Sequence, residues 1–182
     1  YEIEKKLRPY WEQEQKEYPN IEIVWGNALT QIKDLRLKIS DYKVVANLPY
    51  QITSQVLRTL LELENKPERI VIMVQKEVAE RITAKAGDMS LLAVSVQYYG
   101  SPKIVAKVTK GNFWPEPKVD SAILNIETKK LKNGRTFTDK EFFGVARAGF
   151  AHKRKQLWRN LSIGLKLDGK IVKKAVLEVT GN

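Results

Sequence analysis

The chain has 182 residues, 43% of them hydrophobic, and is long enough to bury a core in one domain with a small appendage. It contains no cysteine, which excludes disulfides and thiolate metal ligands. Its single histidine, His152, argues against a histidine-based metal site or catalytic triad. No apolar run is long enough to span a membrane, and we expect a cytoplasmic monomer with no metal ion and no membrane partner.

The net charge of +11 is concentrated in the last third of the chain. Residues 1–128 carry 18 Lys and Arg against 17 Asp and Glu, whereas residues 129–182 carry 14 against 4. Phosphate neutralisation supplies the sequence-independent part of nucleic-acid affinity, so this distribution favours a polyanion-binding element attached to an electrically balanced body. The alternative is a lysine-rich surface that only contacts solvent.

The first 128 residues alternate β-rich runs with helical patterns. Residues 54–63 predict a helix with Leu57, Leu60 and Leu61 on one face and Thr53 as its cap. This alternation implies an α/β fold with a mainly parallel sheet covered on both faces. The last two strands are joined only by a short Pro-rich motif, so they should pair antiparallel. Strands are predicted at residues 21–25, 43–46, 69–74, 103–108 and 121–127.

A polar stretch at residues 128–136 contains Asn133-Gly134 and predicts a linker. It divides the chain into a body, residues 1–128, and a C-terminal helical subdomain, residues 129–182. In the subdomain, Thr138 to Glu141 matches a capping box. The helices are expected to hold Phe142, Phe143, Ala146 and Phe150, then Leu157 and Leu161, and finally residues 171–179.

The most informative motif is the end of the second predicted strand, Val44 to Tyr50, which reads Val-Val-Ala-Asn-Leu-Pro-Tyr. Pro49 holds Leu48 extended, so the Leu48 carbonyl and the Asn47 side-chain oxygen can converge on one N–H₂ group as acceptors. Tyr50 can then stack on a planar base. This combination indicates adenine or cytosine extruded from its stack. The alternative is a strand that simply ends in a proline turn.

Three further blocks accompany this motif: Val74 to Arg81, Gly111 to Ser121 and Phe150 to Leu161. Together the four blocks resemble the ribosomal RNA adenine N6,N6-dimethyltransferases, the KsgA family. The resemblance implies a class I methyltransferase (Rossmann-like) fold, S-adenosyl-L-methionine as cofactor, and dimethylation of two adjacent adenines near the 3′ end of small-subunit rRNA. The partner would be the immature small ribosomal subunit.

The resemblance also implies roles for individual residues. Phe113 would close over the target base opposite Tyr50, and Pro49 and Leu48 would belong to the same catalytic set as Asn47. The cofactor would be held by Glu2, Asn27 and Asn47. RNA phosphates would be met by Lys118, Arg147, Lys153, Arg154, Lys155 and Arg159, with the last four on a helix that packs by its Leu157 and Leu161 stripe. His152 is expected to have only a packing or solvent role.

The chain departs from the family in two respects. Asn27 occupies a position where the family has an aspartate, which removes charge assistance from the bond to the cofactor's adenine; a simple turn residue is the alternative. No Gly-x-Gly motif occurs, and we expect a chain that lacks the family's first βα unit, is truncated at both ends and binds the cofactor poorly on its own. Two other functions remain open: an Erm-like methyltransferase of large-subunit rRNA, and a noncatalytic RNA-binding assembly factor.

Overall fold

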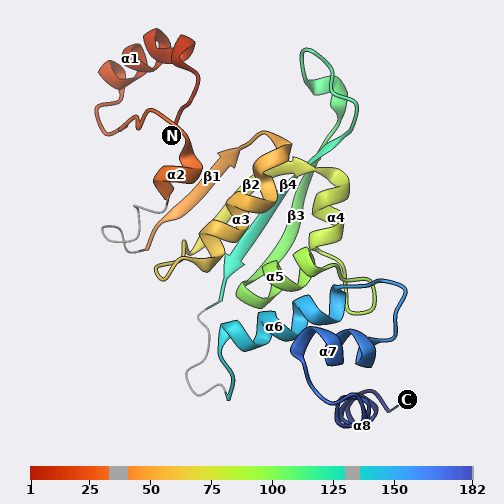
Figure 1. The fold of residues 1–182 in the computed structure, drawn as a ribbon. Coiled ribbons are helices and arrows are strands. Elements are labelled where there is room, and N and C mark those ends of the chain that lie inside the picture. Colours follow the sequence, from red (N-terminus) through yellow and green to blue (C-terminus); the bar gives the residue numbers. More distant parts are fainter. Residues whose placement is uncertain (33–40, 130–135, 182) are drawn as a thin grey trace.

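The computed structural model describes residues 1–32, 41–129 and 136–181 (Figure 1). Its four strands are β1 Lys43–Asn47, β2 Arg69–Gln75, β3 Gly100–Val108 and β4 Ser121–Thr128. Its α-helices are α1 Arg8–Glu17, α2 Ala28–Gln31, α3 Thr53–Glu62, α4 Lys76–Ile82, α5 Leu91–Tyr99, α6 Asp139–Phe150, α7 Leu157–Leu165 and α8 Gly169–Thr180. Short 3-10 helices are η1 Lys5–Leu7, η3 Tyr50–Ile52 and η4 Lys110–Asn112.

The strands form one sheet in the order β1-β2-β4-β3. β1 and β2 are parallel, because α3 returns the chain between them, whereas β4 pairs antiparallel with both β2 and β3. The predicted antiparallel pair is therefore confirmed. Among the described strands, β1, β2 and β3 run in the same direction and only β4 is reversed, so the predicted mainly parallel strand direction is confirmed, although two of the three strand pairs are antiparallel.

The core lies between one face of the sheet and helices α3, α4 and α5 (Figure 1). Ile70, Ile72, Leu124 and Ile126 point from the strands into this core and are at most 1% exposed. The predicted stripe of Leu57, Leu60 and Leu61 on α3 is confirmed, since all three are buried. The other face is not covered by the described residues: Val45 on β1 is 82% exposed. The expectation of helices on both faces is wrong here for that reason.

Two local predictions in the body are also wrong. Residues 21–25 form only an isolated parallel bridge between Glu2 and Trp25, because no other described segment offers them a ladder of partners. Thr53 is the first residue of α3 and not its cap; the cap position is Ile52, and the buried Thr53 hydroxyl has no hydrogen-bond partner in the described structure.

The C-terminal helices follow the predicted order. The capping box of α6 is confirmed: the Thr138 hydroxyl accepts from the Glu141 N–H, and the Glu141 carboxylate accepts from the Thr138 N–H at 2.7 Å. Asp139 fastens α6 to the end of α5, because its carboxylate accepts hydrogen bonds from the hydroxyls of Tyr98 at 2.7 Å and Tyr99 at 2.9 Å. The Tyr98 ring also stacks on Phe142, with centroids 4.1 Å apart.

The predicted leucine stripe of α7 is correct only in part. Leu161 is half-buried, but Leu157 is 45% exposed, and the fully buried residue of this helix is Asn160. Most of the predicted linker, with Asn133 and Gly134, lies outside the described residues. No helix in the described ranges has the length and apolar character needed to cross a lipid bilayer.

Candidate active site

Residues from two distant segments line one open hollow at the carboxyl end of β1. The hollow has a volume of about 380 Å³ and is lined by Asn47, Leu48, Pro49, Tyr50, Met73 and Phe113. The structure thus brings together all five residues that were predicted to take part in catalysis. Met73 was not predicted; it lies directly beside Asn47 in the parallel register of β1 and β2.

The local turn follows from Pro49. It has no N–H to continue a ladder, and with φ −54° and ψ 133° it caps η3 instead, its carbonyl accepting from the Ile52 N–H at 3.1 Å. η3 leads directly into α3. β1 therefore ends at Asn47, and Asn47 and Tyr50 are presented beside each other at the edge of the hollow.

The Tyr50 ring is held at its far end by Ser121. The two hydroxyl oxygens are 2.7 Å apart, and Ser121, the first residue of β4, is completely buried. The bond fixes the phenol against the sheet and leaves the rest of the half-buried ring beside the hollow. Sequence reasoning missed this role of Ser121, because the two partners are 71 residues apart and only the sheet brings them together.

Phe113 reaches the hollow from the loop between β3 and β4. Its N–H donates to the Lys110 carbonyl at 3.2 Å, which closes η4, and its side chain is half-buried. Two aromatic rings and a thioether thus line a hollow whose polar side-chain groups are the Asn47 amide and the Tyr50 hydroxyl. Such a lining suits a flat, mostly apolar ring that carries one polar group.

The Asn47 side chain is available to a ligand. It is exposed, and in the part of the chain that the structure describes its amide makes no hydrogen bond. An amide oxygen accepts two hydrogen bonds, and the neighbouring backbone carbonyl of Leu48 is a second acceptor. Within the described ranges, no cluster of His, Cys, Asp or Glu side chains is arranged to hold a metal ion.

Glu2 and Asn27 lie together but do not line this hollow. The Glu2 N–H donates to the Val24 carbonyl at 3.1 Å, and the Gly26 N–H donates to the Glu2 carbonyl at 2.8 Å. Glu2 Oε1 accepts from the Glu4 N–H at 2.7 Å, and Asn27 Oδ1 caps α2 by accepting from the Leu29 N–H at 2.9 Å. Asn27 thus occupies the turn position that was the alternative to cofactor binding.

Gly26 makes the turn between this bridge and α2. Its φ of +135° is accessible to glycine and strained for other residues, and a Cβ there would come within 2.9 Å of Gln31 Nε2. The residues fit an adenosyl group in part. Glu2 Oε2 makes no hydrogen bond among the described residues and could accept one from the cofactor. Asn27 Oδ1, in contrast, already accepts a hydrogen bond from the Leu29 N–H.

The four basic residues at 153–155 and 159 do not lie on one helix, contrary to the prediction. Lys153, Arg154 and Lys155 lie in the exposed turn between α6 and α7, since α7 begins only at Leu157. The helix that was predicted through them is interrupted because Asn160 Nδ2 donates to the carbonyls of Gly149 and His152, both at 3.0 Å. The His152 carbonyl also accepts from the Lys155 N–H at 3.1 Å.

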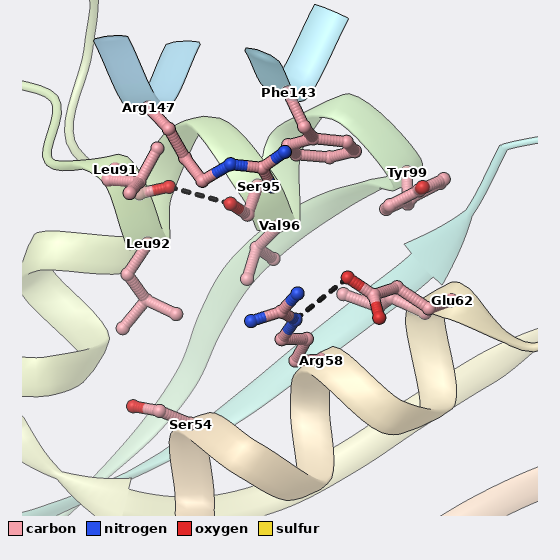
Figure 2. Close-up of a pocket in the computed structure, with 11 residues that line it drawn as sticks. Ser54, Arg58, Glu62, Leu91, Leu92, Ser95, Val96, Tyr99, Phe143 and Arg147 are labelled. Atoms are coloured by element: carbon pink, nitrogen blue, oxygen red, sulfur yellow. Dashed lines mark hydrogen bonds and ion pairs between the residues drawn. The ribbon is translucent and has the colours of Figure 1, made fainter. Parts of the chain in front are cut away.

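The other three predicted RNA-contacting residues are dispersed. Arg159 lies on α7 with its guanidinium 5.2 Å from the centroid of the Trp158 ring. Lys118 lies in the loop between β3 and β4, near Asp120. Arg147 extends from α6 over a separate apolar hollow (Figure 2).

That apolar hollow, of about 250 Å³, lies between α3, α5 and α6. Leu92, Val96 and Phe143 line it, as do Arg58 and Glu62, which form an ion pair of 2.8 Å (Figure 2). Burial, followed by the bond to Asp139, raises the pKa of Tyr99 at one end of it. No residue assigned to catalysis lines it, so it is not part of the candidate active site.

Comparison with known proteins places this geometry in context. Residues 1–178 match the family Ribosomal RNA adenine dimethylase. The Ribosomal RNA small subunit methyltransferase A of Dehalococcoides mccartyi is 42% identical over 172 residues, which cover 94% of this chain and 59% of that protein. The probable ribosomal RNA small subunit methyltransferase A of Methanococcus aeolicus is 46% identical over 158 residues, 85% of this chain and 56% of the relative.

Solved structures agree with the fold that the sequence predicts. A dimethyladenosine transferase from Plasmodium falciparum matches with a TM-score of 0.74 and 27% identity, over 88% of this chain and 57% of that one. The 23S rRNA methyltransferase ErmE matches with a TM-score of 0.75 and 25% identity, over 98% and 70%. The Rossmann-like α/β class is therefore confirmed. The chain spans a little under three-fifths of the length of the curated relatives described above.

Proposed function

The chain belongs to the ribosomal RNA adenine dimethylase family, and on that premise we propose that the protein it comes from transfers methyl groups to N6 of two adjacent adenines near the 3′ end of small-subunit rRNA. The proposal is supported by curated relatives named for the small subunit at 42% and 46% identity. The likeness to a 23S rRNA enzyme is lower, at 25% identity. The substrate would be the immature small ribosomal subunit.

In this proposal Asn47 and Leu48 orient the reacting amine. The Asn47 side-chain oxygen and the Leu48 carbonyl accept hydrogen bonds from the two N6 protons of the adenine. These bonds draw the amine out of conjugation with the ring and fix the direction of the nitrogen lone pair. When bound, S-adenosyl-L-methionine supplies the electrophilic methyl group of its sulfonium.

The proton leaving N6 passes to water. Among the described residues that line the hollow there is no carboxylate, imidazole or amine, and the Tyr50 hydroxyl is already bonded to Ser121. A dedicated general base is therefore not part of the proposed mechanism. The rate depends instead on how the amine is positioned.

Tyr50 and Phe113 hold the flipped base. An adenine taken out of its stack leaves its neighbours, and stacking on aromatic side chains repays about 1–3 kcal/mol per base. Tyr50 is suited to this because Ser121 fixes its ring, and Phe113 approaches from a different segment. The cofactor would be held by the free carboxylate oxygen of Glu2, with its adenine near Asn27 and its methyl group near Asn47.

The phosphates of the RNA backbone would contact Lys153, Arg154 and Lys155 in the exposed basic turn, and Arg159 on the helix that follows it. This assignment is supported by the charge of residues 129–182, which carry 14 Lys and Arg against 4 Asp and Glu. Lys118 and Arg147 would contact the RNA from other elements. Such contacts position the substrate and carry no sequence preference of their own.

The observation that carries the proposal is the Asn47 amide, which makes no hydrogen bond among the described residues and lies beside two aromatic rings in one hollow. The proposal is tested by methylation of small subunits isolated from cells that lack the gene, with the rRNA product read by mass spectrometry. The full-length protein should convert two adjacent adenines to dimethyladenine. Methylation of large-subunit rRNA, or of no rRNA, would contradict the proposal.

A further inference from the structure

The loop between β3 and β4, residues 109–120, carries the most exposed large hydrophobic side chain among the described residues. Trp114 is 98% exposed, whereas the other three tryptophans are half-buried. Two of these are also covered by cations: Arg8 lies 5.0 Å from the ring of Trp25, and Arg159 lies 5.2 Å from the ring of Trp158. Tryptophan is usually well buried, because its large ring gains much from leaving water. A fully exposed indole ring presents a large apolar face on which a planar partner can stack.

The exposure of Trp114 does not come from an irregular loop. Asn112 Nδ2 donates to the carbonyl and the hydroxyl of Thr109, at 3.2 and 2.8 Å. The Lys110 N–H donates to Asp120 Oδ1 at 3.0 Å, and Lys110 Nζ pairs with Glu116 Oε1 at 2.9 Å. These contacts tie both ends of the loop together. The ring is thus presented to solvent by a segment with its own hydrogen bonds.

The position of the ring relates it to the candidate active site. Trp114 directly follows Phe113, which lines the hollow with Asn47 and Tyr50. In Figure 1 this loop extends past the end of the sheet, away from helices α6 to α8. Consecutive Cα atoms are about 3.8 Å apart, but the backbone at Phe113 is extended, with φ −120° and ψ 150°, so the two rings point to different sides of the loop. A base stacked on Trp114 would therefore flank a base held against Phe113 and would not share its hollow.

Charge does not provide the contact at this loop. A neighbouring hollow of about 390 Å³ contains three lysines and three carboxylates, which largely offset each other at close range. Even with the contact from Lys118, a phosphate would gain less there than at the exposed basic turn of Lys153, Arg154 and Lys155. Stacking is tolerant of sequence and needs no charge, because every base has a π-face. The hollow's charged residues are Lys76, Lys110, Lys118, Glu77, Glu80 and Asp120.

We propose that Trp114 stacks on an RNA base that flanks the target adenine and so holds the strand in register at the active site. This inference rests on the proposed function, since it needs an RNA substrate at the Asn47 hollow. Trp114 would be a positioning residue: it binds a neighbouring nucleotide and does not touch the reacting amine.

The test uses the full-length protein and a short rRNA hairpin with 2-aminopurine next to the target adenines. Wild-type protein should quench the 2-aminopurine fluorescence by stacking. Trp114→Ala should remove this quenching and raise the Kd about 5- to 150-fold, the range that corresponds to the removal of one base–aromatic stack. Trp114→Phe should retain most of the quenching and most of the RNA affinity. Tyr10→Ala, at an aromatic that is 70% exposed on α1, is the matched control and should change neither.

The outcomes separate this inference from the proposed function. If Trp114→Ala binds and quenches as wild type does while Asn47→Ala abolishes methylation, the role of Trp114 is wrong and the enzyme assignment stands. If wild type methylates no rRNA, the proposed function has failed first. Because Trp114 is almost fully exposed, its substitution should leave the fold intact, and circular dichroism checks this.

Discussion

The hydroxyl of Tyr50 lies 2.7 Å from the hydroxyl of Ser121, which joins the turn after β1 to the first residue of β4. Ser121 is completely buried and Tyr50 is half-buried, so this contact is shielded from water on the side of the sheet. It couples the aromatic residue of the active-site turn to a strand on the far side of β2. The sheet thereby determines where the Tyr50 ring stands.

Replacing Ser121 with Ala should loosen Tyr50 without removing its ring. We expect a decrease of about 1 kcal/mol in the free energy of unfolding, as for a typical hydrogen bond, and a fall in kcat. Tyr50→Phe should lower the free energy of unfolding by at least as much, because it leaves the Ser121 hydroxyl buried without a hydrogen-bond partner. Denaturant unfolding and methylation kinetics measure the two effects. If the decreases in the free energy of unfolding of the two single variants simply add in the double variant, the hydrogen bond does not contribute to stability.

The turn between α6 and α7 depends on Asn160. Its Nδ2 donates to two carbonyls at 3.0 Å each, and the residue is only 3% exposed. Asn160→Asp keeps the volume and removes both donors, so unfolding should become easier by about 1–3 kcal/mol. Thermal or denaturant unfolding of the variant provides the measurement. Asn20→Asp, at an exposed turn residue, is the control and should have little effect.

Periodicity and local chemistry predicted much of this fold. The spacing of Leu57, Leu60 and Leu61 identified the buried side of α3, and the Thr138 and Glu141 pair located the start of α6. The short link before Ser121 predicted an antiparallel pair. These features depend on residues close together in the chain.

The Thr53 cap was misplaced by one residue, whereas the other errors involve partners outside the local sequence pattern. Residues 21–25 have strand-like composition, but a strand must pair with a neighbouring strand. Among the described residues, this segment makes only the bridge between Trp25 and Glu2. Lys153 to Lys155 were assigned to a helix because a hydrogen bond from the Asn160 side chain to a backbone carbonyl cannot be recognised from the spacing of hydrophobic residues. The bond between Ser121 and Tyr50 likewise requires the completed sheet.

The basic turn should set the salt dependence of RNA binding. Replacing Lys153, Arg154 and Lys155 together with Ala should weaken binding across RNA sequences and flatten the slope of log K against log salt by roughly 0.7–0.9 for each phosphate that is no longer neutralised. The exposed Lys5, Lys6 and Lys16 give a control triple with the same change in charge. A slope that changes equally in both triples would show that only net charge matters.

Tyr99 should make stability fall at alkaline pH. Burial and the bond to Asp139 raise its pKa above the ordinary value of 10.0, so the folded state keeps a proton that the unfolded chain releases. Stability from this group is therefore complete below pH 10 and declines as the pH rises above it. Unfolding of wild type and Tyr99→Phe should be compared from pH 8 to 11. The variant should show the shallower decline; parallel curves would contradict the assignment.

The catalytic role of Asn47 is tested most directly by Asn47→Ala in the full-length enzyme acting on immature small subunits, with kcat and RNA affinity measured separately. Asn47 is assigned to the amine of the flipped adenine, so kcat should fall by at least 100-fold, on the order of the effect of removing one transition-state hydrogen bond, while the Kd for RNA stays within about twofold. Asn20→Ala should leave both unchanged. Equal decreases in kcat and RNA affinity, or full activity in Asn47→Ala, would mean that Asn47 only ends a strand, and the catalytic assignment would be wrong.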